Sequence, residues 1–225
     1  MTQGLLFVLS EPEPGDEATF HDWYDNEHAP ARTAMAGFHA GRRYRAADGA
    51  TPSWLAVYDL ELEVLRSEDY QRLRTRRSAR ERQVIAGLRT LDRRVYELTG
   101  THGAAPERLA PALVATLLSV APEHESELHR WYEEEHIPML LKTPGWNRIR
   151  RYRKTDGPGP VFLALHEIDG VEAFGTDQYR TATTTPWRRR IHRYATARER
   201  RVFTFHNSVA EPPAAGSGDE KPGAR

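Results

Sequence analysis

Residues 20–30 read FHDWYDNEHAP, and residues 128–138 read LHRWYEEEHIP. The two stretches share His, Trp, Tyr, Glu, His and Pro in the same order, 108 positions apart. The register continues without a gap, since the Arg-Arg-Tyr-Arg run at 42–45 returns at 150–153. A match that holds through several expected turns indicates a tandem duplication of one structural unit.

Each copy has the same expected order of elements, β-α-β-β-α-β. The apolar runs, turn signals and helical spacing predict strands at 4–10, 38–45, 53–60 and 93–98 with helices at 16–28, 67–73 and 80–88 in the first copy, and strands at 113–120, 146–153, 161–168 and 200–205 with helices at 123–136, 171–179 and 187–195 in the second. Proline disfavours helical geometry in the residue before it. Pro30 and Pro138 therefore predict that each first helix ends near the motif histidine.

The domain organisation follows from this repeat. We expect a first ferredoxin-like repeat over 1–100, a linker over 101–111, a second repeat over 112–209 and a disordered tail over 210–225. The linker is rich in Gly, Ala and Pro, and the tail has no apolar periodicity.

Composition narrows the class of protein. The 225 residues are 39% apolar, and 32 Lys and Arg balance 32 Asp and Glu. A zero net charge argues against nucleic acid or an acidic membrane as the partner. The chain has no cysteine, which excludes disulfides and thiolate sites. Without a signal peptide or an apolar stretch of membrane-spanning length, the sequence predicts a cytoplasmic protein.

The chain resembles the dimeric α+β barrel superfamily, and each half is similar to its EthD-like proteins. The resemblance depends on the element order and on Trp-Tyr-x-x-Glu-His-x-Pro at the end of the first helix, and it covers about 4–98 and 113–209. It implies two ferredoxin-like units whose antiparallel sheets close one intramolecular barrel. Members of the superfamily include cofactor-free monooxygenases, polyketide cyclases, decarboxylases, lactone isomerases, dehydratases and haem enzymes.

The duplicated motif supplies the candidate catalytic residues. Histidine can move a proton near neutral pH, a neighbouring tyrosine can position it, and a glutamate can orient the imidazole or its helix. The candidates are His28, His136, Tyr24, Tyr132, Glu27 and Glu135. A purely structural role of the motif, with the tryptophans in the core, stays open as an alternative.

Further residues are candidates for substrate binding because they share a helical face with the motif, lie on the second strand of each copy or, for His166, have no histidine at the matching position of the other copy. They are His21, His129, Trp23, Trp131, Tyr44, Tyr152 and His166. Tyr58 stands where the repeat register places the counterpart of His166. This asymmetry indicates that one half is specialised.

Our leading hypothesis is a cofactor-independent acid/base enzyme of dehydratase, cyclase or isomerase type. Its substrate would be a small aromatic or polyketide-like metabolite in the barrel cavity, and we expect neither a cofactor nor a metal. The alternatives are a cofactor-free monooxygenase, a non-catalytic small-molecule binding protein, or a haem protein using His166, His192 or His206. Further pairing into a homodimer also stays open.

Overall fold

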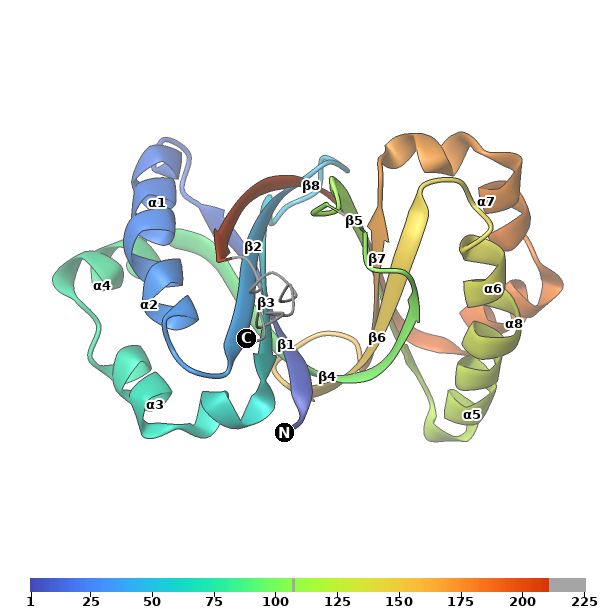
Figure 1. The fold of residues 1–225 in the computed structure, drawn as a ribbon, viewed down its shortest axis with the longest axis horizontal. Helices are drawn as coiled ribbons and strands as arrows, with labels where there is room; N and C mark the ends of the chain where they lie inside the picture. Colours follow the sequence, from blue (N-terminus) through green and yellow to red (C-terminus); the bar gives the residue numbers. More distant parts are fainter. Residues whose placement is uncertain (107, 211–225) are drawn as a thin grey trace, which may run out of the picture.

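The computed structural model describes residues 1–106 and 108–210. Within these residues, eight antiparallel strands form a closed barrel in the order β1-β3-β2-β8-β5-β7-β6-β4 (Figure 1). The strands are β1 (Gln3–Pro12), β2 (Phe38–Ala46), β3 (Trp54–Glu61), β4 (Leu88–Gly103), β5 (Ala112–Val120), β6 (Trp146–Asp156), β7 (Phe162–Ile168) and β8 (Ala195–Ala210). The α+β class expected from the sequence is confirmed.

The helices lie outside the barrel, those of the first half on one side and those of the second half on the opposite side (Figure 1). The first half has α1 (Glu17–Trp23), the π-helical turn η1 (Tyr24–His28), α2 (Ala29–Thr33), the 3-10 turn η2 (Leu62–Arg66), α3 (Glu68–Thr75) and α4 (Ala79–Ala86). The second half has α5 (Pro122–Trp131), the π-helical turn η3 (Tyr132–His136), α6 (Ile137–Leu140), the 3-10 turn η4 (Val171–Gly175), α7 (Asp177–Ala182) and α8 (Pro186–Tyr194). The two halves thus have the same order of elements.

The closing strands are much longer than the sequence predicts, and they join the halves. β8 pairs with β2 as well as β5, and β4 pairs with β6 as well as β1. Residues 101–103, which we expected in a linker, belong to β4 because their backbone groups pair with β6. The expected disordered tail lies outside the described residues from 211 onward.

The expected end of the motif helix is wrong in both halves. The helix continues through Pro30 and Pro138, each of which lies in the first turn of the following α-helix. The residue before each proline donates its N–H to a carbonyl five residues back, as in Ala29 to Tyr24. This π-helical turn opens a new first turn, where a proline needs no N–H donor.

Three groups of buried residues form the core. One lies under the helices of each half, and the third fills the middle of the barrel with side chains from both halves, including Phe7, Tyr44, Leu117 and Tyr152. Close packing of this kind leaves little room for a ligand. Side chains therefore fill the middle of the barrel, and the space expected inside it is confined to one mouth, where a hollow of about 960 Å³ is lined in part by the inward-facing Tyr44.

Candidate functional site

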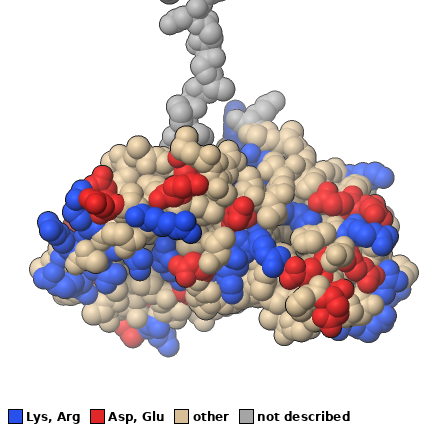
Figure 2. Space-filling view, turned by 90° about the horizontal axis from the view of Figure 1, so that it is seen from below, with Lys and Arg blue, Asp and Glu red and all other residues tan. Residues whose placement is uncertain are grey.

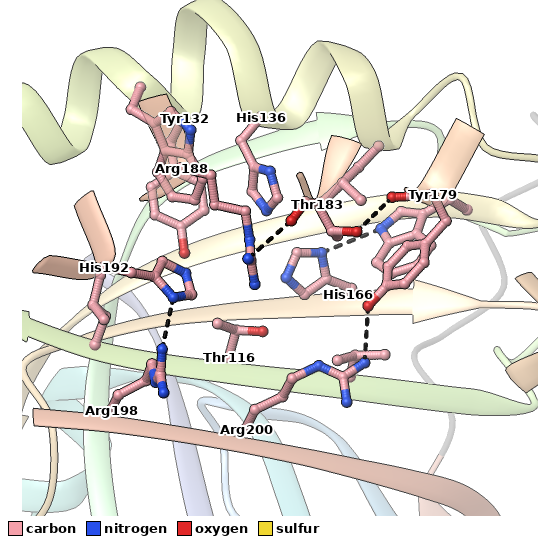
Figure 3. Close-up of a pocket in the computed structure, with 15 residues that line it drawn as sticks. Thr116, Tyr132, His136, His166, Tyr179, Thr183, Arg188, His192, Arg198 and Arg200 are labelled. Atoms are coloured by element: carbon pink, nitrogen blue, oxygen red, sulfur yellow. Dashed lines mark hydrogen bonds between the residues drawn. The ribbon is translucent and has the colours of Figure 1, made fainter. Parts of the chain in front are cut away.

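A pocket of about 340 Å³ lies in the second half, between the helical layer and the outward face of the sheet (Figure 3). Its floor includes Val114 and Leu118 of β5, which belong to the core under the helices, whereas Leu113 and Leu117 face into the barrel. The aromatic residues in its wall are Trp131, Tyr132, Trp146 and Tyr179. The pocket is therefore outside the barrel and suits a flat, partly apolar molecule.

His136 ends the π-helical turn η3 and enters the pocket from the helical side (Figure 3). Its ring stacks on Trp131 with centroids 4.2 Å apart, and its Nδ1 lies 3.2 Å from the carbonyl oxygen of Ala182. A carbonyl oxygen only accepts hydrogen bonds, so Nδ1 carries the proton of the neutral ring and Nε2 keeps its lone pair. Burial, with a smaller contribution from Arg188, lowers the pKa of His136 to about 3.

The other two pocket histidines have the opposite tautomer. The indole N–H of Trp146 donates to Nδ1 of His166 at 3.2 Å, and Arg198 donates to Nδ1 of His192 at 2.7 Å. Indole and guanidinium groups only donate, so in both neutral rings the proton is on Nε2. Burial lowers the pKa of His166 far below its usual range, and burial together with nearby arginines lowers that of His192 to about 4.

Three arginines reach the pocket, and their hydrogen-bond partners are neutral. Arg188 donates to the carbonyl oxygen of Thr183 at 2.9 Å, Arg198 to His192, and Arg200 to the hydroxyl of Tyr179 at 3.3 Å. Among the described residues that line the pocket, none is Asp or Glu. The lining thus carries positive charge with no carboxylate to balance it.

The corresponding region of the first half is closed. Tyr58, at the position of His166, donates its hydroxyl to that of Tyr24 at 3.1 Å, and both side chains are buried. Nδ1 of His28 lies 3.5 Å from a carboxylate oxygen of Glu81, which also pairs with Arg32 at 3.7 Å. Charge is balanced there and the aromatic rings fill the space.

The two halves carry side chains of opposite charge at one equivalent helix position. Glu81 is the third residue after the Ser78 cap of α4, and Arg188 is the third residue after the Thr185 cap of α8; each donates its backbone N–H to the capping hydroxyl. A carboxylate beside the motif histidine in the first half is therefore replaced by a guanidinium in the second. The 108-residue register aligns Arg188 with Arg80 instead, so this exchange appears only when the helices are aligned by their caps.

The motif glutamates hold helices together and do not line the pocket. Glu135 accepts the indole N–H of Trp131 at 3.1 Å and the hydroxyl of Thr185 at 2.6 Å, which joins the motif helix to the start of α8. Glu27 pairs with Arg80 on α4. Both contacts match a role in orienting the helix.

The two earlier histidines of the motif lie beside arginines of the second strands. His21 and His129 each bond through Nδ1 to an outward-facing arginine, Arg43 at 2.9 Å and Arg151 at 2.8 Å. Neither histidine lines the pocket of the second half. Trp23 is buried in the first-half core, where its ring contacts that of His28.

Tyr44 and Tyr152 point into the barrel, away from the motif histidines. They border hollows at one barrel mouth, the larger of which has a volume of about 960 Å³. Ion pairs there balance arginines with carboxylates: Arg42 and Arg150 with Asp59, and Arg148 and Arg150 with Glu167. The structure thus separates these two predicted residues from Tyr132, His136 and His166, which it brings together with Trp131.

The motif and its register do not predict the three arginines, Thr183 and Tyr179 as pocket residues, and His192 is expected only as a haem ligand in one alternative. That haem alternative does not fit the arrangement, because His166 and His192 both carry their proton on Nε2. His206 lies elsewhere, against His21 and Trp54.

The described residues contain neither a metal-binding cluster nor a membrane-spanning helix. In residues 1–106 and 108–210, no three His, Cys, Asp or Glu side chains are grouped to hold a metal ion. No helix of the described chain is both long and apolar enough to cross a membrane.

Known structures share this architecture at low sequence identity. No family model and no curated protein matches the sequence. An anthrone oxidase-like protein superposes with a TM-score of 0.67 at 12% identity over 96% of both chains. A mutant chlorite dismutase from Candidatus Nitrospira defluvii gives 0.62 at 12% over 91% of both, and a putative monooxygenase from Fusobacterium nucleatum gives 0.61 at 11% over 94% of this chain and 95% of that one. These similarities show the fold alone, which is a ferredoxin-like α+β fold.

Proposed function

We propose that this chain is a cofactor-independent acid/base enzyme of dehydratase, cyclase or isomerase type, acting on a small aromatic or polyketide-like molecule in the pocket of the second half. The observation that carries the proposal is the state of His136. Its neutral ring is fixed through Nδ1 to Ala182, and its free Nε2 lies in a pocket walled by aromatic rings. A general base needs this combination of an oriented ring and an unprotonated nitrogen.

In the proposed reaction, Nε2 of His136 takes a proton from an acidic C–H or hydroxyl of the substrate. The electron pair stays on the substrate as an enolate or phenolate. Arg188 and the Nε2–H of His166 supply positive charge and a hydrogen-bond donor to this anion. Return of the proton to another carbon gives an isomer, and its delivery to a departing hydroxyl gives a dehydrated product and water.

The low pKa of His136 is compatible with this role once a ligand is bound. In the empty pocket, burial and the charge of Arg188 both disfavour the imidazolium. An anion beside Arg188 offsets that charge and stabilises the imidazolium, which moves the pKa toward the working range of a base. Base strength therefore develops together with the substrate anion.

Arg188 differs from the buried arginines elsewhere in the described chain. Those six all have a carboxylate within ion-pair distance: Arg32, Arg43, Arg94, Arg150, Arg151 and Arg201. Arg188 is half-buried, and no ion pair joins it to a described carboxylate. A substrate anion would supply the missing partner.

A cofactor-free monooxygenase is the second candidate. It is favoured by the similarity over nearly the whole chain to structures named as putative monooxygenases and as an anthrone oxidase-like protein. Such an enzyme would form the same substrate anion and then pass its electrons to dioxygen. Oxygen uptake in proportion to product distinguishes it from the acid/base enzyme, which consumes none.

We further propose that the halves arose by duplication of one EthD-like unit, with repeats over 1–100 and 112–209. The shared element order and the paired motifs support this proposal. A cytoplasmic location and a homodimer remain predictions. A fused barrel already pairs two units within one chain, so size-exclusion chromatography with light scattering is the direct test of further association.

His136→Asn tests the proposed base. The asparagine amide can keep a hydrogen bond to the carbonyl of Ala182 while Nε2 is lost. His28→Asn is the matched control in the closed half. With a substrate identified by native mass spectrometry or by screening enolisable aromatic compounds, we expect turnover to fall at least 100-fold in H136N and less than twofold in H28N. Equal turnover in H136N and the unsubstituted protein would exclude His136 as the base, and saturable binding without any product would indicate a binding protein.

A further inference from the structure

Two arginines of β8 lie at the mouth of the pocket. Arg198 and Arg200 are two residues apart on β8 and both line the pocket, so they project from the same face of the strand. Figure 3 shows them on the side opposite His136, with Arg188 between. Both are exposed, which places them where the pocket meets solvent.

Most N–H donors of Arg198 and Arg200 have no hydrogen-bond partner among the described residues. A guanidinium has five N–H donors, and each of these groups has one hydrogen bond among the described residues, to His192 or to Tyr179. The side chain of Arg200 also lies over the ring of Phe174 at 5.0 Å, which holds it near the opening. Several donors of each fork therefore remain for a planar anion.

The first half offers an internal comparison. Along the strand pairs, Arg93 stands opposite Val8 of β1 as Arg200 stands opposite Thr116 of β5. Arg93 is neutralised by Asp156 at 3.0 Å, and Leu91 takes the place that corresponds to Arg198. Only the half with the pocket thus presents two strand arginines without a carboxylate among the described residues.

The lining of the pocket differs in charge from the face of the molecule shown in Figure 2. Figure 2 shows acidic and basic side chains interspersed over one face of the molecule, in keeping with equal numbers of each in the chain. Inside the pocket the formal charge is of one sign. A concave site of single sign attracts ligands of the opposite sign and favours those that pair with it.

We infer that the ligand is an aromatic carboxylate, with its carboxylate held by Arg198 and Arg200 at the mouth and its ring between the aromatic walls. This inference depends on the proposed function only for which atom reacts. The ring enters toward His136 while the carboxylate stays at the solvent side. Arg188, deeper in the pocket, remains available for a second negative charge that forms on the ring or its side chain.

The test compares 2-naphthoate with its neutral analogue 2-naphthamide, using the fluorescence of the pocket tryptophans in the full chain. We expect 2-naphthoate to bind at least tenfold more tightly, and R198Q/R200Q to remove at least that tenfold preference. R189Q/R193Q is the matched control because it removes two exposed charges of α8 that do not line the pocket. It should change the Kd less than twofold.

Equal affinity for the acid and the amide, or an unchanged Kd for 2-naphthoate in R198Q/R200Q, would overturn the inference. Thermal melts of each variant identify loss of folding as a separate cause. H136N separates this inference from the proposed function: it should lose turnover and still bind 2-naphthoate at least tenfold more tightly than 2-naphthamide. If carboxylates bind as expected while no turnover is found, the proposed function is wrong and the inference about the ligand stands. If only neutral compounds are turned over, the proposed function stands and the inference about the ligand is wrong.

Discussion

Two buried histidines, His136 and His166, and the mostly buried His28 should make the stability of this protein strongly dependent on pH. Burial is the main reason that the folded-state pKa of His28 is about 4 and that of His136 about 3, and burial lowers the pKa of His166 in the same direction. In the unfolded chain each would titrate near 6.5. Below that pH the unfolded state binds protons that the folded state does not, so stability is fully present above about pH 6.5 and falls as the pH is lowered toward the folded-state pKa values.

The size of the effect follows from proton linkage. Between pH 7 and pH 5, His28 and His136 should each lower the free energy of unfolding by about 2 kcal/mol, and His166 adds to this loss. The losses from His28 and His136 together approach about 4 kcal/mol, which is a large part of the ~5–15 kcal/mol free energy of unfolding typical of a folded domain. Carboxylates with lowered pKa, such as Asp59, lose their contribution at lower pH and so do not obscure this window.

Urea unfolding followed by tryptophan fluorescence at pH 7 and pH 5, at constant ionic strength, measures the change. His136→Asn removes one titrating group and should reduce the pH-dependent loss by about 2 kcal/mol. His39→Asn is the control, because that side chain is 46% exposed. A loss below about 1 kcal/mol in the unsubstituted protein, or the same loss in H136N, would refute the assignment of neutral buried rings.

Other substitutions test the ion pairs and the pocket. Asp59→Asn removes the carboxylate that Arg42 and the buried Arg150 share, which leaves Arg150 paired with Glu167 alone, and it should lower the free energy of unfolding in urea by about 3 kcal/mol; an effect below about 1 kcal/mol would contradict the pairing. Arg188→Glu recreates the first-half arrangement and should raise the pKa of His136, measured by NMR titration, while abolishing 2-naphthoate binding; an unchanged pKa would show that the two groups do not interact. Trp146→Phe removes the donor that fixes the proton of His166, so kcat should fall about tenfold with KM within twofold, and a change in KM alone would assign the contact to binding.

The sequence was sufficient for the architecture because the architecture depends on repeated local signals. Apolar runs, the Asp-Gly turns and the duplicated motif predicted the strands and helices of both halves to within a few residues at most ends. The strand ends that were predicted wrongly depend on nonlocal contacts. β4 extends to Gly103 because β6 lies beside it, and no periodicity within 88–103 reports that pairing.

The site was only partly accessible to sequence analysis for a related reason. The motif identified Tyr132 and His136, and the mismatch with Tyr58 drew attention to His166. The arginines were not found because they come from α8 and β8, where the gapless register no longer describes the repeat. Which histidine nitrogen carries the proton also depends on partners from other elements, such as Ala182 and Trp146.

The duplicated motif itself does not make a site, since both halves keep it and one half is closed. In the first half, Glu81 gives the motif histidine an acidic partner and Tyr58 fills the space beside it. In the second, Arg188 and His166 occupy the corresponding places, and a cationic pocket remains. The motif therefore fixes the helix and the ring of the histidine, through the π-helical turn and its aromatic contacts, while the residues facing it decide whether that ring is structural or free to react. Under the proposed function, this division would give the same motif a structural role in the first half and a catalytic role in the second.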